Sequence, residues 1–206
     1  MNDGPLEAAR RQVAEAGEAG RISVRKGDGL AVIAPGEVDA ITIAGMGGAL
    51  IVSILDEGQA KLAGVQRLVL QPNVGGGFVR RWVLEHDWDL AEEAILGGDG
   101  KIYEAMMAEA RPDVRERNAE LYRERTLPGS QVCLTRELQL LMGPRLTTAP
   151  NEVFFAKWES ELRKLEGIRR SVASSTLEAS RQKEAELARL SEQIEEVLAC
   201  LPKDKR

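Results

Sequence analysis

The feature that most constrains the fold is the alternation of strand-like and helix-like segments over the first 110 residues. The predicted strands are residues 22–25, 39–44, 67–70, 89–96 and 102–109. The predicted helices are residues 6–16, 49–57 and 78–86. The last two strands are joined around Asp99-Gly100, a typical hairpin turn. This order predicts an α/β domain, with a parallel sheet covered by helices on both faces and finished by an antiparallel hairpin.

The pattern changes after residue 110. Residues 111–130 are polar and contain two prolines, which indicates a connector, and residues 132–142 are predicted to be a short helix. From about residue 151 the chain is charged and helical, with apolar residues at three- and four-residue spacing. These apolar positions are Phe155, Trp158, Leu162, Leu165, Leu187, Leu190, Ile194, Val197 and Leu201. The register breaks at residues 171–176, so we predict an antiparallel coiled-coil hairpin. The predicted domains are therefore residues 1–110 and residues 111–206.

Composition and charge narrow the class of protein. The chain of 206 residues is 43% hydrophobic, too apolar for a disordered chain, yet it contains no apolar run of the ~20 residues that span a membrane. The amino-terminal sequence does not resemble a secretory signal, so a cytoplasmic protein is expected. Residues 1–110 carry a net charge of −7 and residues 111–206 one of +2, which makes the second part the better candidate for contacting a polyanion. One histidine and two cysteines without ligand spacing predict no metal site and no hydrolase triad.

Three predicted strand ends carry residues suited to binding a ligand. They are Gly27-Asp28-Gly29, Gly45-Met46-Gly47-Gly48 and Gln71-Pro72-Asn73. Ligands of open parallel sheets lie beyond the carboxyl ends of the strands, where glycines allow a close backbone approach. Each segment alone could be an ordinary turn, but together they favour a binding site. None is a phosphate-binding P-loop.

Two groups of basic residues could contact phosphate. Arg80 and Arg81 lie on the helix that follows Asn73, close to the predicted site, and are the more specific candidates. The basic residues of the predicted helical hairpin could follow a nucleic-acid backbone, but acidic neighbours alternate with them and could make this an ordinary solvated face.

Four segments resemble a known family. Arg21–Ile33 (RISVRKGDGLAVI), Asp39–Ile51 (DAITIAGMGGALI), Arg67–Gly76 (RLVLQPNVGG) and Asp99–Glu109 (DGKIYEAMMAE) resemble the bacterial tRNA adenine-N1 methyltransferases of the TrmK family. The later GPRL and F-x-x-W sequences are similar to the helical hairpin of that family. The resemblance covers essentially the whole chain. It implies methylation of adenine 22 of tRNA with S-adenosylmethionine, a class I (Rossmann-like) methyltransferase sheet, and a coiled coil that helps to hold the tRNA.

The resemblance also implies roles for individual residues. Asp28 and Gly29 match the family's loop at the adenine side of the cofactor, and Ala44, Gly45 and Met46 match its cofactor-binding loop. Gly47 and Gly48, followed by the Gln71-Pro72-Asn73 segment, match the family's residues beside the target base. The implied mechanism is positioning of a flipped adenine against the methyl donor. No residue can be named as a general base.

The sequence departs from the family at its beginning. The family starts with a strand, a loop that holds the methionine end of the cofactor, a helix and a second strand, whereas residues 3–16 already match the following helix. We therefore expect a partial sheet with unpaired strand edges and a half-built cofactor pocket. This is the pattern of a shortened gene model or fragment; the alternative is a natural variant completed by another chain.

Three hypotheses about function follow. The first is a tRNA adenine-N1 methyltransferase, in a truncated and inactive form if the missing loop is essential. The second is a non-catalytic tRNA-binding module that retains the coiled coil. The third is a coiled-coil assembly protein anchored by its sheet domain.

Overall fold

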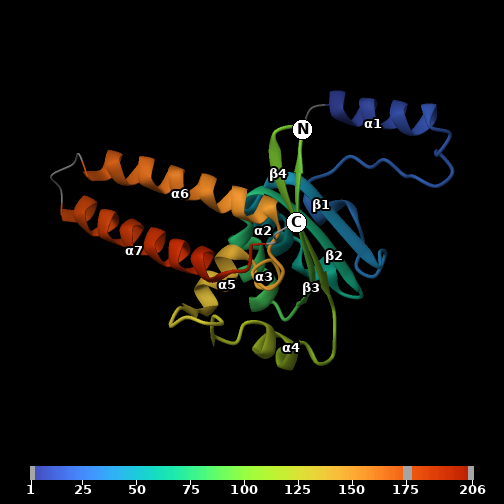
Figure 1. The fold of residues 1–206 in the computed structure, drawn as a ribbon. Helices are drawn as coiled ribbons and strands as arrows, with labels where there is room; N and C mark the ends of the chain where they lie inside the picture. The colour runs from blue at the N-terminus through green and yellow to red at the C-terminus, as the bar shows by residue number, and fades with distance from the viewer. Residues whose placement is uncertain (1–2, 174–177, 204–206) are drawn as a thin grey trace.

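The computed structural model describes residues 3–173 and 178–203 and contains a mixed four-stranded sheet (Figure 1). Its strands are β1 (Ala40–Gly47), β2 (Arg67–Val74), β3 (Asp89–Gly98) and β4 (Lys101–Glu109), in the spatial order β1-β2-β4-β3. Strands β1 and β2 are parallel, while β4 runs antiparallel to both β2 and β3. The predicted hairpin of β3 and β4 is confirmed, and the parallel arrangement is limited to one strand pair.

The helices follow the predicted order in most places. They are α1 (Asp3–Glu15), α2 (Gly48–Glu57), α3 (Gly76–Glu85), α4 (Val114–Leu121), α5 (Arg136–Met142), α6 (Glu152–Ala173) and α7 (Glu178–Cys200). Short 3-10 helices cover Gly29–Val32 and Gln59–Leu62, and β5 (Arg125–Thr126) pairs with β6 (Cys133–Leu134). The predicted connector therefore contains a helix, α4, and the predicted helix 132–142 begins only after Thr135. The hydroxyl of Thr135 accepts a hydrogen bond from the Leu138 amide at 3.3 Å, a typical helix N-cap.

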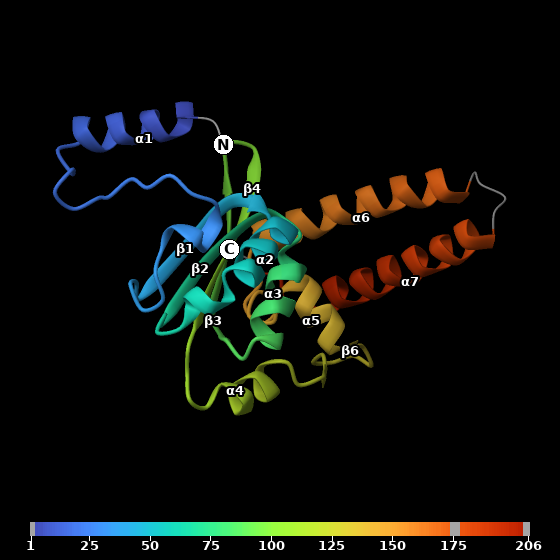
Figure 2. The ribbon, with the colours of Figure 1, turned by 180° about the vertical axis from the view of Figure 1, so that it is seen from behind.

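Helices α2 and α3 cover one face of the sheet (Figure 2). The row Ile43, Leu70 and Met106, from three neighbouring strands, is buried under these helices. On the opposite face Thr42 is exposed, and its register partner Val69 is only half-buried. The prediction of cover on both faces is therefore wrong, because within the described residues the apolar helices pack on one face only.

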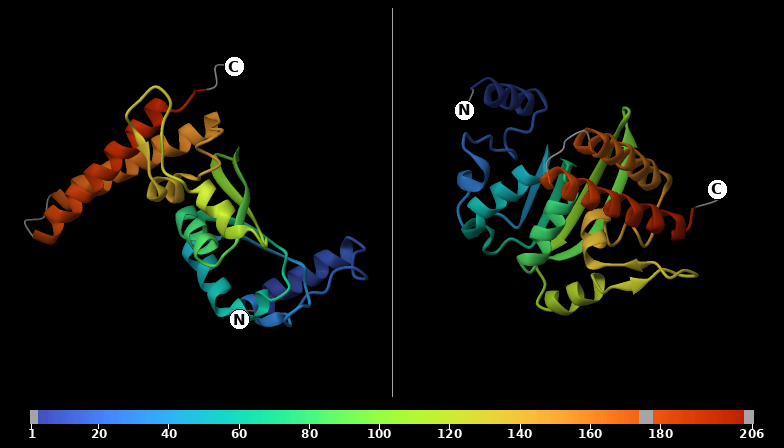
Figure 3. Two further views of the ribbon diagram at one scale, coloured as in Figure 1. Left: turned by 90° about the horizontal axis from the view of Figure 1, so that it is seen from below. Right: turned by 90° about the vertical axis from the view of Figure 1, so that its left-hand side faces the viewer.

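The predicted strand at residues 22–25 is also wrong. These residues form no strand, and the Ile22 side chain is 49% exposed. The segment has only two apolar side chains, and Arg25 is instead ion-paired with Glu37 and donates to the Val32 carbonyl. The outer edge of β1 consequently has no partner strand in the described chain, as expected for a partial sheet. Helix α1 forms as predicted but projects from the sheet, on the side opposite the α6–α7 pair (Figures 1 and 3).

Helices α6 and α7 lie side by side and antiparallel (Figures 1 and 3). Eight of the nine predicted apolar positions pack into the second buried cluster of the protein, and the ninth, Leu187, is also buried. The helical hairpin is confirmed, while its supercoiling stays a prediction and residues 174–177 of its tip lie outside the described residues. The domain boundary at residue 110 also stays a prediction. Tyr122 and Leu140, from beyond this boundary, belong to the core of the sheet, and Ile95 of β3 belongs to the core of the hairpin.

None of the helices in the described part of the chain combines the length and the apolar character needed to cross a bilayer.

Candidate active site

The carboxyl ends of β1 and β2 meet in a junction made of glycine backbone. Gly47 pairs with Val74, and a Cβ atom on Gly48 would lie 2.1 Å from the carbonyl oxygen of Gly75. Real Cβ atoms essentially never approach this closely, so Gly48 cannot be replaced without moving the backbone. Two of the three predicted strand-end segments are therefore brought together as the sequence suggested. We call this junction, Ala44–Gly48 with residues 71–75, the rim.

Hydrogen bonds fix the rim across the two strands. Gly45 has a φ of +78°, and the strand register shifts on both sides of Met46, which is the geometry of a β-bulge. The Gly45 amide donates to Gln71 Oε1 at 2.9 Å, and Gln71 Nε2 donates to Asn73 Oδ1 at 3.2 Å. Gln71 is thus a bridge that holds the bulge and orients the amide of Asn73. Ala44, Gly45, Met46 and Asn73 are exposed, so the rim faces solvent.

The third predicted segment lies elsewhere. Asp28 and Gly29 are exposed, and a Cβ atom on Gly29 would lie 3.1 Å from the Ile54 side chain. The next residue, Leu30, packs on Gly58. Both contacts are with the second half of α2 and the residue that ends it. Ile54 already lies about 9 Å along the helix axis from Gly48, and Gly58 lies farther still. The segment is therefore placed beside α2 rather than against the β1–β2 junction.

A groove with a cavity volume of about 830 Å³ runs from the rim to the helical hairpin. One wall is the segment Pro72–Gly77, and the other includes α6 residues and the beginning of β4. Lys101, Lys157 and Lys164 line it together with Glu104, Glu161, Tyr103 and Trp158. Trp158 is 3% exposed, and its indole N–H has no hydrogen-bond partner among the described residues. Lys164 is one of the hairpin residues that the sequence suggested for contact with a nucleic-acid backbone, and this role stays a prediction. Lys101 and Lys157 could not be singled out from the sequence, because each is one charge in a charged turn or helix and only the tertiary fold brings them to the groove.

Arg80 is not a phosphate-binding residue, and this prediction is wrong. Its side chain is fully buried, 2.6 Å from Glu93 and 2.7 Å from Glu104, and it also donates to the Leu141 carbonyl. Burial alone would lower the pKa of Arg80, but the two carboxylates outweigh it and hold the pKa above its ordinary value. Lys157 of α6 lies 2.6 Å from the same Glu104. The cluster of Arg80, Glu93, Glu104 and Lys157 therefore ties α3 and the sheet to α6.

Arg81 of α3 and His86, which caps the end of α3, make contacts near the surface of the protein. Arg81 is 45% exposed and lies 2.5 Å from Glu137 of α5, a hydrogen bond that raises the pKa of Arg81. This partner occupies its guanidinium, so any role of Arg81 toward phosphate stays a prediction. His86 ends α3, where its ring stacks on Trp82 with centroids 4.3 Å apart and its Nδ1 lies 2.9 Å from the Trp82 carbonyl.

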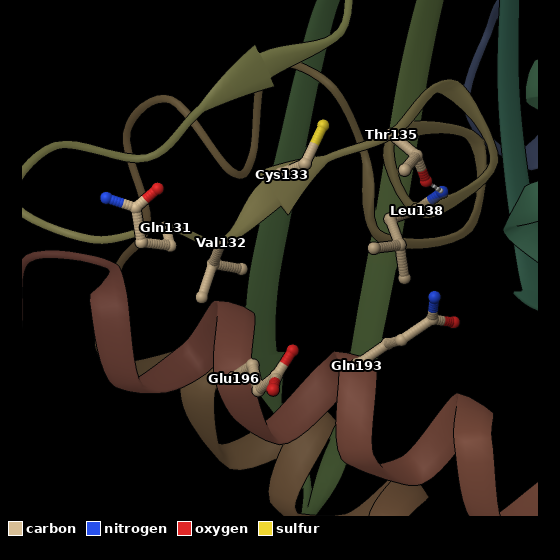
Figure 4. A pocket seen from close by; sticks show the side chains of 7 residues that line it. All are labelled: Gln131, Val132, Cys133, Thr135, Leu138, Gln193 and Glu196. Carbon is tan, nitrogen blue, oxygen red and sulfur yellow. Dashed lines mark hydrogen bonds between the residues drawn. The ribbon is translucent and has the colours of Figure 1, made fainter.

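A second cavity, of about 300 Å³, lies between β6 and α7 (Figure 4). Gln193 and Glu196 of α7 face Val132 and Leu138 across it, while the Cys133 thiol points away from α7. Among the residues that the structure describes, its lining shares none with the rim and includes no cation that would attract a phosphate. Within the described residues no cluster of histidine, cysteine and acidic side chains could hold a metal ion.

Comparison with known proteins decides the family. The sequence model of the TrmK family, described as tRNA (adenine(22)-N(1))-methyltransferase, matches residues 1–199. The chain belongs to the TrmK family. The curated tRNA (adenine(22)-N(1))-methyltransferase of Bacillus subtilis strain 168 is 41% identical over 199 residues, which cover 96% of this chain and 78% of the relative.

Solved structures of the TrmK family agree with this fold. The crystal structure of the B. subtilis TrmK enzyme matches with a TM-score of 0.80, over 96% of this chain and 79% of that chain. A putative tRNA (m1A22) methyltransferase of Streptococcus pneumoniae, solved in complex with S-adenosyl-L-methionine, is 34% identical and matches with a TM-score of 0.73 over 96% of this chain and 78% of that chain. The resemblance and the Rossmann-like α/β fold predicted from the sequence are thus confirmed, and the chain is a member of an enzyme family.

Proposed function

We propose that this chain catalyses the transfer of a methyl group from S-adenosylmethionine to N1 of adenine 22 in tRNA. The observation that carries the proposal is the rim, which opens directly into a groove lined by three lysines. A methyltransferase acting on RNA needs a nucleoside-sized site beside a surface that attracts phosphate, and the position of the rim next to the lysines of the groove supports the proposal.

The rim fits one side of the cofactor. The Gly48–Gly75 contact and the bulge at Gly45 place glycine backbone at the strand ends, which suits close approach by a nucleoside. We propose that Ala44, Gly45 and Met46 contact S-adenosylmethionine, and that Asp28 and Gly29 would do so only after moving toward the rim. When bound, the cofactor supplies an electrophilic methyl group on sulfur.

The residues of the chain then act by positioning the base. N1 of neutral adenine carries a lone pair and no proton, so its attack on a methyl group needs no general base. This agrees with a rim in which the described side chains offer amides rather than a titrating pair. We propose that Gly47 and Gly48 admit the flipped adenine. Asn73, which follows Pro72 and is oriented by Gln71, would accept a hydrogen bond from the exocyclic amino group of this adenine.

The groove is the proposed path of the tRNA backbone. Lys101 forms no ion pair within the described residues, and Lys164 pairs only with its helix neighbour Glu161, at 2.7 Å on the surface of α6. Exposed pairs of this kind are worth little, so a phosphate can replace the carboxylate. Because tRNA is the proposed substrate, we also propose a cytoplasmic location.

Incubation with S-adenosylmethionine and unmodified tRNA, followed by nuclease digestion and mass spectrometry, tests the proposal. We expect N1-methyladenosine in tRNA carrying adenine 22 and none when guanine replaces that adenine. Methylation of both tRNAs, or of neither, would contradict the proposal.

A non-catalytic tRNA-binding module is the second candidate. It is favoured by the position of Asp28 and Gly29 beside α2 and by the unpaired outer edge of β1, which leave the rim with a single wall. Calorimetry separates the two functions. The enzyme binds both S-adenosylmethionine and tRNA, whereas the module binds tRNA alone.

A further inference from the structure

Exposed apolar side chains gather around the rim. Val74 is 69% exposed, Phe78 61%, Leu50 53% and Met46 37%. Met46 and Val74 belong to the ends of β1 and β2, and Leu50 and Phe78 to the first turns of the two helices that follow. Four of the seven large exposed apolar side chains among the described residues thus lie in the two chain segments that meet at the Gly48–Gly75 contact. Apolar patches of this kind mark binding surfaces more often than scattered residues do.

Phe78 is held in place by the glycine loop before α3. Gly75 adopts a left-handed conformation with φ +73°, and its carbonyl accepts a hydrogen bond from the Phe78 amide at 3.1 Å. A Cβ atom on Gly75 would lie 3.0 Å from the edge of the Phe78 ring, so the ring lies against bare backbone. The same Gly75 carbonyl contacts Gly48 across the rim. The Phe78 ring therefore lies beside the junction of the two strand ends.

The core does not require this aromatic ring. On the same helix Val79, Trp82 and Val83 are buried and supply the contacts with the sheet and α2. The Trp82 indole N–H also donates to Asp56 at 2.5 Å. Phe78 lies on the first turn and keeps most of its surface in solvent. Packing within the described residues therefore does not account for its size and position.

We propose that Phe78 is a stacking platform for an unpaired nucleobase of the substrate RNA at the rim, an inference that rests on the proposed function. A base removed from its helix loses its stacking partners, and an aromatic side chain replaces them whatever the base. The lysine-lined groove begins at the neighbouring residues Val74–Gly77, so the phosphate backbone and the base would be bound side by side. The positive charge of the groove lysines favours a nucleic acid over an apolar protein segment as the occupant. Phe78 would be a positioning residue that orients the base, with no part in bond making.

The experiment compares four variants: Phe78→Ala, Phe78→Leu, Phe78→Trp and the control Leu96→Ala. Leu96 is equally exposed, at 60%, but lies on β3 outside the rim and the groove. Binding is measured by fluorescence anisotropy with a short single-stranded oligoadenylate and with the same oligonucleotide made abasic, so that neither tRNA folding nor methyl transfer is needed. We expect Phe78→Ala and Phe78→Leu to bind the oligoadenylate about 5- to 150-fold more weakly, Phe78→Trp to bind as the wild type does, and the control to be unchanged. Binding of the abasic oligonucleotide should be the same for all proteins.

Different results refute different claims. Full binding by Phe78→Leu would overturn the stacking role, since leucine keeps the apolar surface without the ring. An unchanged oligoadenylate affinity in Phe78→Ala, with a change from dimer to monomer in sedimentation, would show instead that the patch joins two copies of the chain. If adenine binding depends on Phe78 but no N1-methyladenosine forms, the proposed function fails and this inference stands. If methylation proceeds equally in wild type and Phe78→Ala, the inference fails and the function stands.

Discussion

Replacing Arg80 by alanine should destabilise the whole protein. The change leaves Glu93, fully buried, and Glu104, 8% exposed, without their shared cation, and it removes the hydrogen bond to the Leu141 carbonyl of α5. Breaking a buried ion pair by removing one partner costs about 3–5 kcal/mol, because the remaining charge is buried and uncompensated. For a chain of this length that corresponds to a fall in Tm of roughly 6–20 °C.

The neighbouring arginine provides a matched control. Arg81 is 45% exposed and its partner Glu137 is 70% exposed, so Arg81→Ala should change the free energy of unfolding by about 0–1 kcal/mol. Thermal unfolding followed by circular dichroism measures both variants. Equal, small losses in the two variants, or a folded Arg80→Ala protein that only loses tRNA binding, would refute the assignment of Arg80 to the buried cluster.

Three further predictions concern pH, the rim and the groove. Burial alone would raise the pKa of Glu104, but Arg80 and Lys157 hold it below the usual 4.5, so its stabilising contribution is complete above pH 4.5 and is lost as the pH falls further. Acid unfolding of Glu104→Gln should therefore depend less on pH than that of the wild type. Gly48→Ala should lower Tm and weaken S-adenosylmethionine binding in calorimetry because its Cβ has no room, whereas Gly167→Ala, in open space on α6, should stabilise by about 0.5–1 kcal/mol. Reversing the charge at Lys101 and Lys164 should weaken tRNA binding in filter assays and make it less dependent on salt; an unchanged salt slope would exclude them from the interface.

The sequence alone predicted correctly those helices and strands whose local residue pattern agrees with the contacts that they make in the folded protein. The apolar strand 39–44 and the glycines after it predicted β1 and the rim, since backbone conformation and close approach are encoded by the glycines themselves. The apolar spacing from Phe155 to Leu201 predicted the two helices and the side chains that they bury.

The errors have a common cause in tertiary contacts. Residues 22–25 have the alternation of a strand, but a strand needs a hydrogen-bonded neighbour, and within the described residues the segment has none. Arg80 and Arg81 look equivalent in the sequence, yet their positions differ by about 100° around α3, so one faces the buried acids of β3 and β4 and the other faces solvent. Local sequence cannot show which acidic residues a neighbouring strand will bring.

The positions of the other site residues depend on tertiary geometry that a sequence motif does not contain. The loop at Asp28 carries the family's sequence but lies beside α2, and no local feature of GDGL indicates this position. Phe78 was assigned only as the start of a helix, and its exposure beside the rim follows from the three glycines before it, at 75–77, which no pattern of hydrophobicity records.

Amide chemical shifts measured by NMR during titration with S-adenosylhomocysteine test the central claim most directly. If the ends of β1 and β2 form the cofactor side of the site, the amides of Gly45, Gly47 and Gly48 shift together and saturably, while those around the cavity between β6 and α7 stay unchanged. Shifts confined to that cavity, or scattered over the protein without the three glycines, would contradict the account.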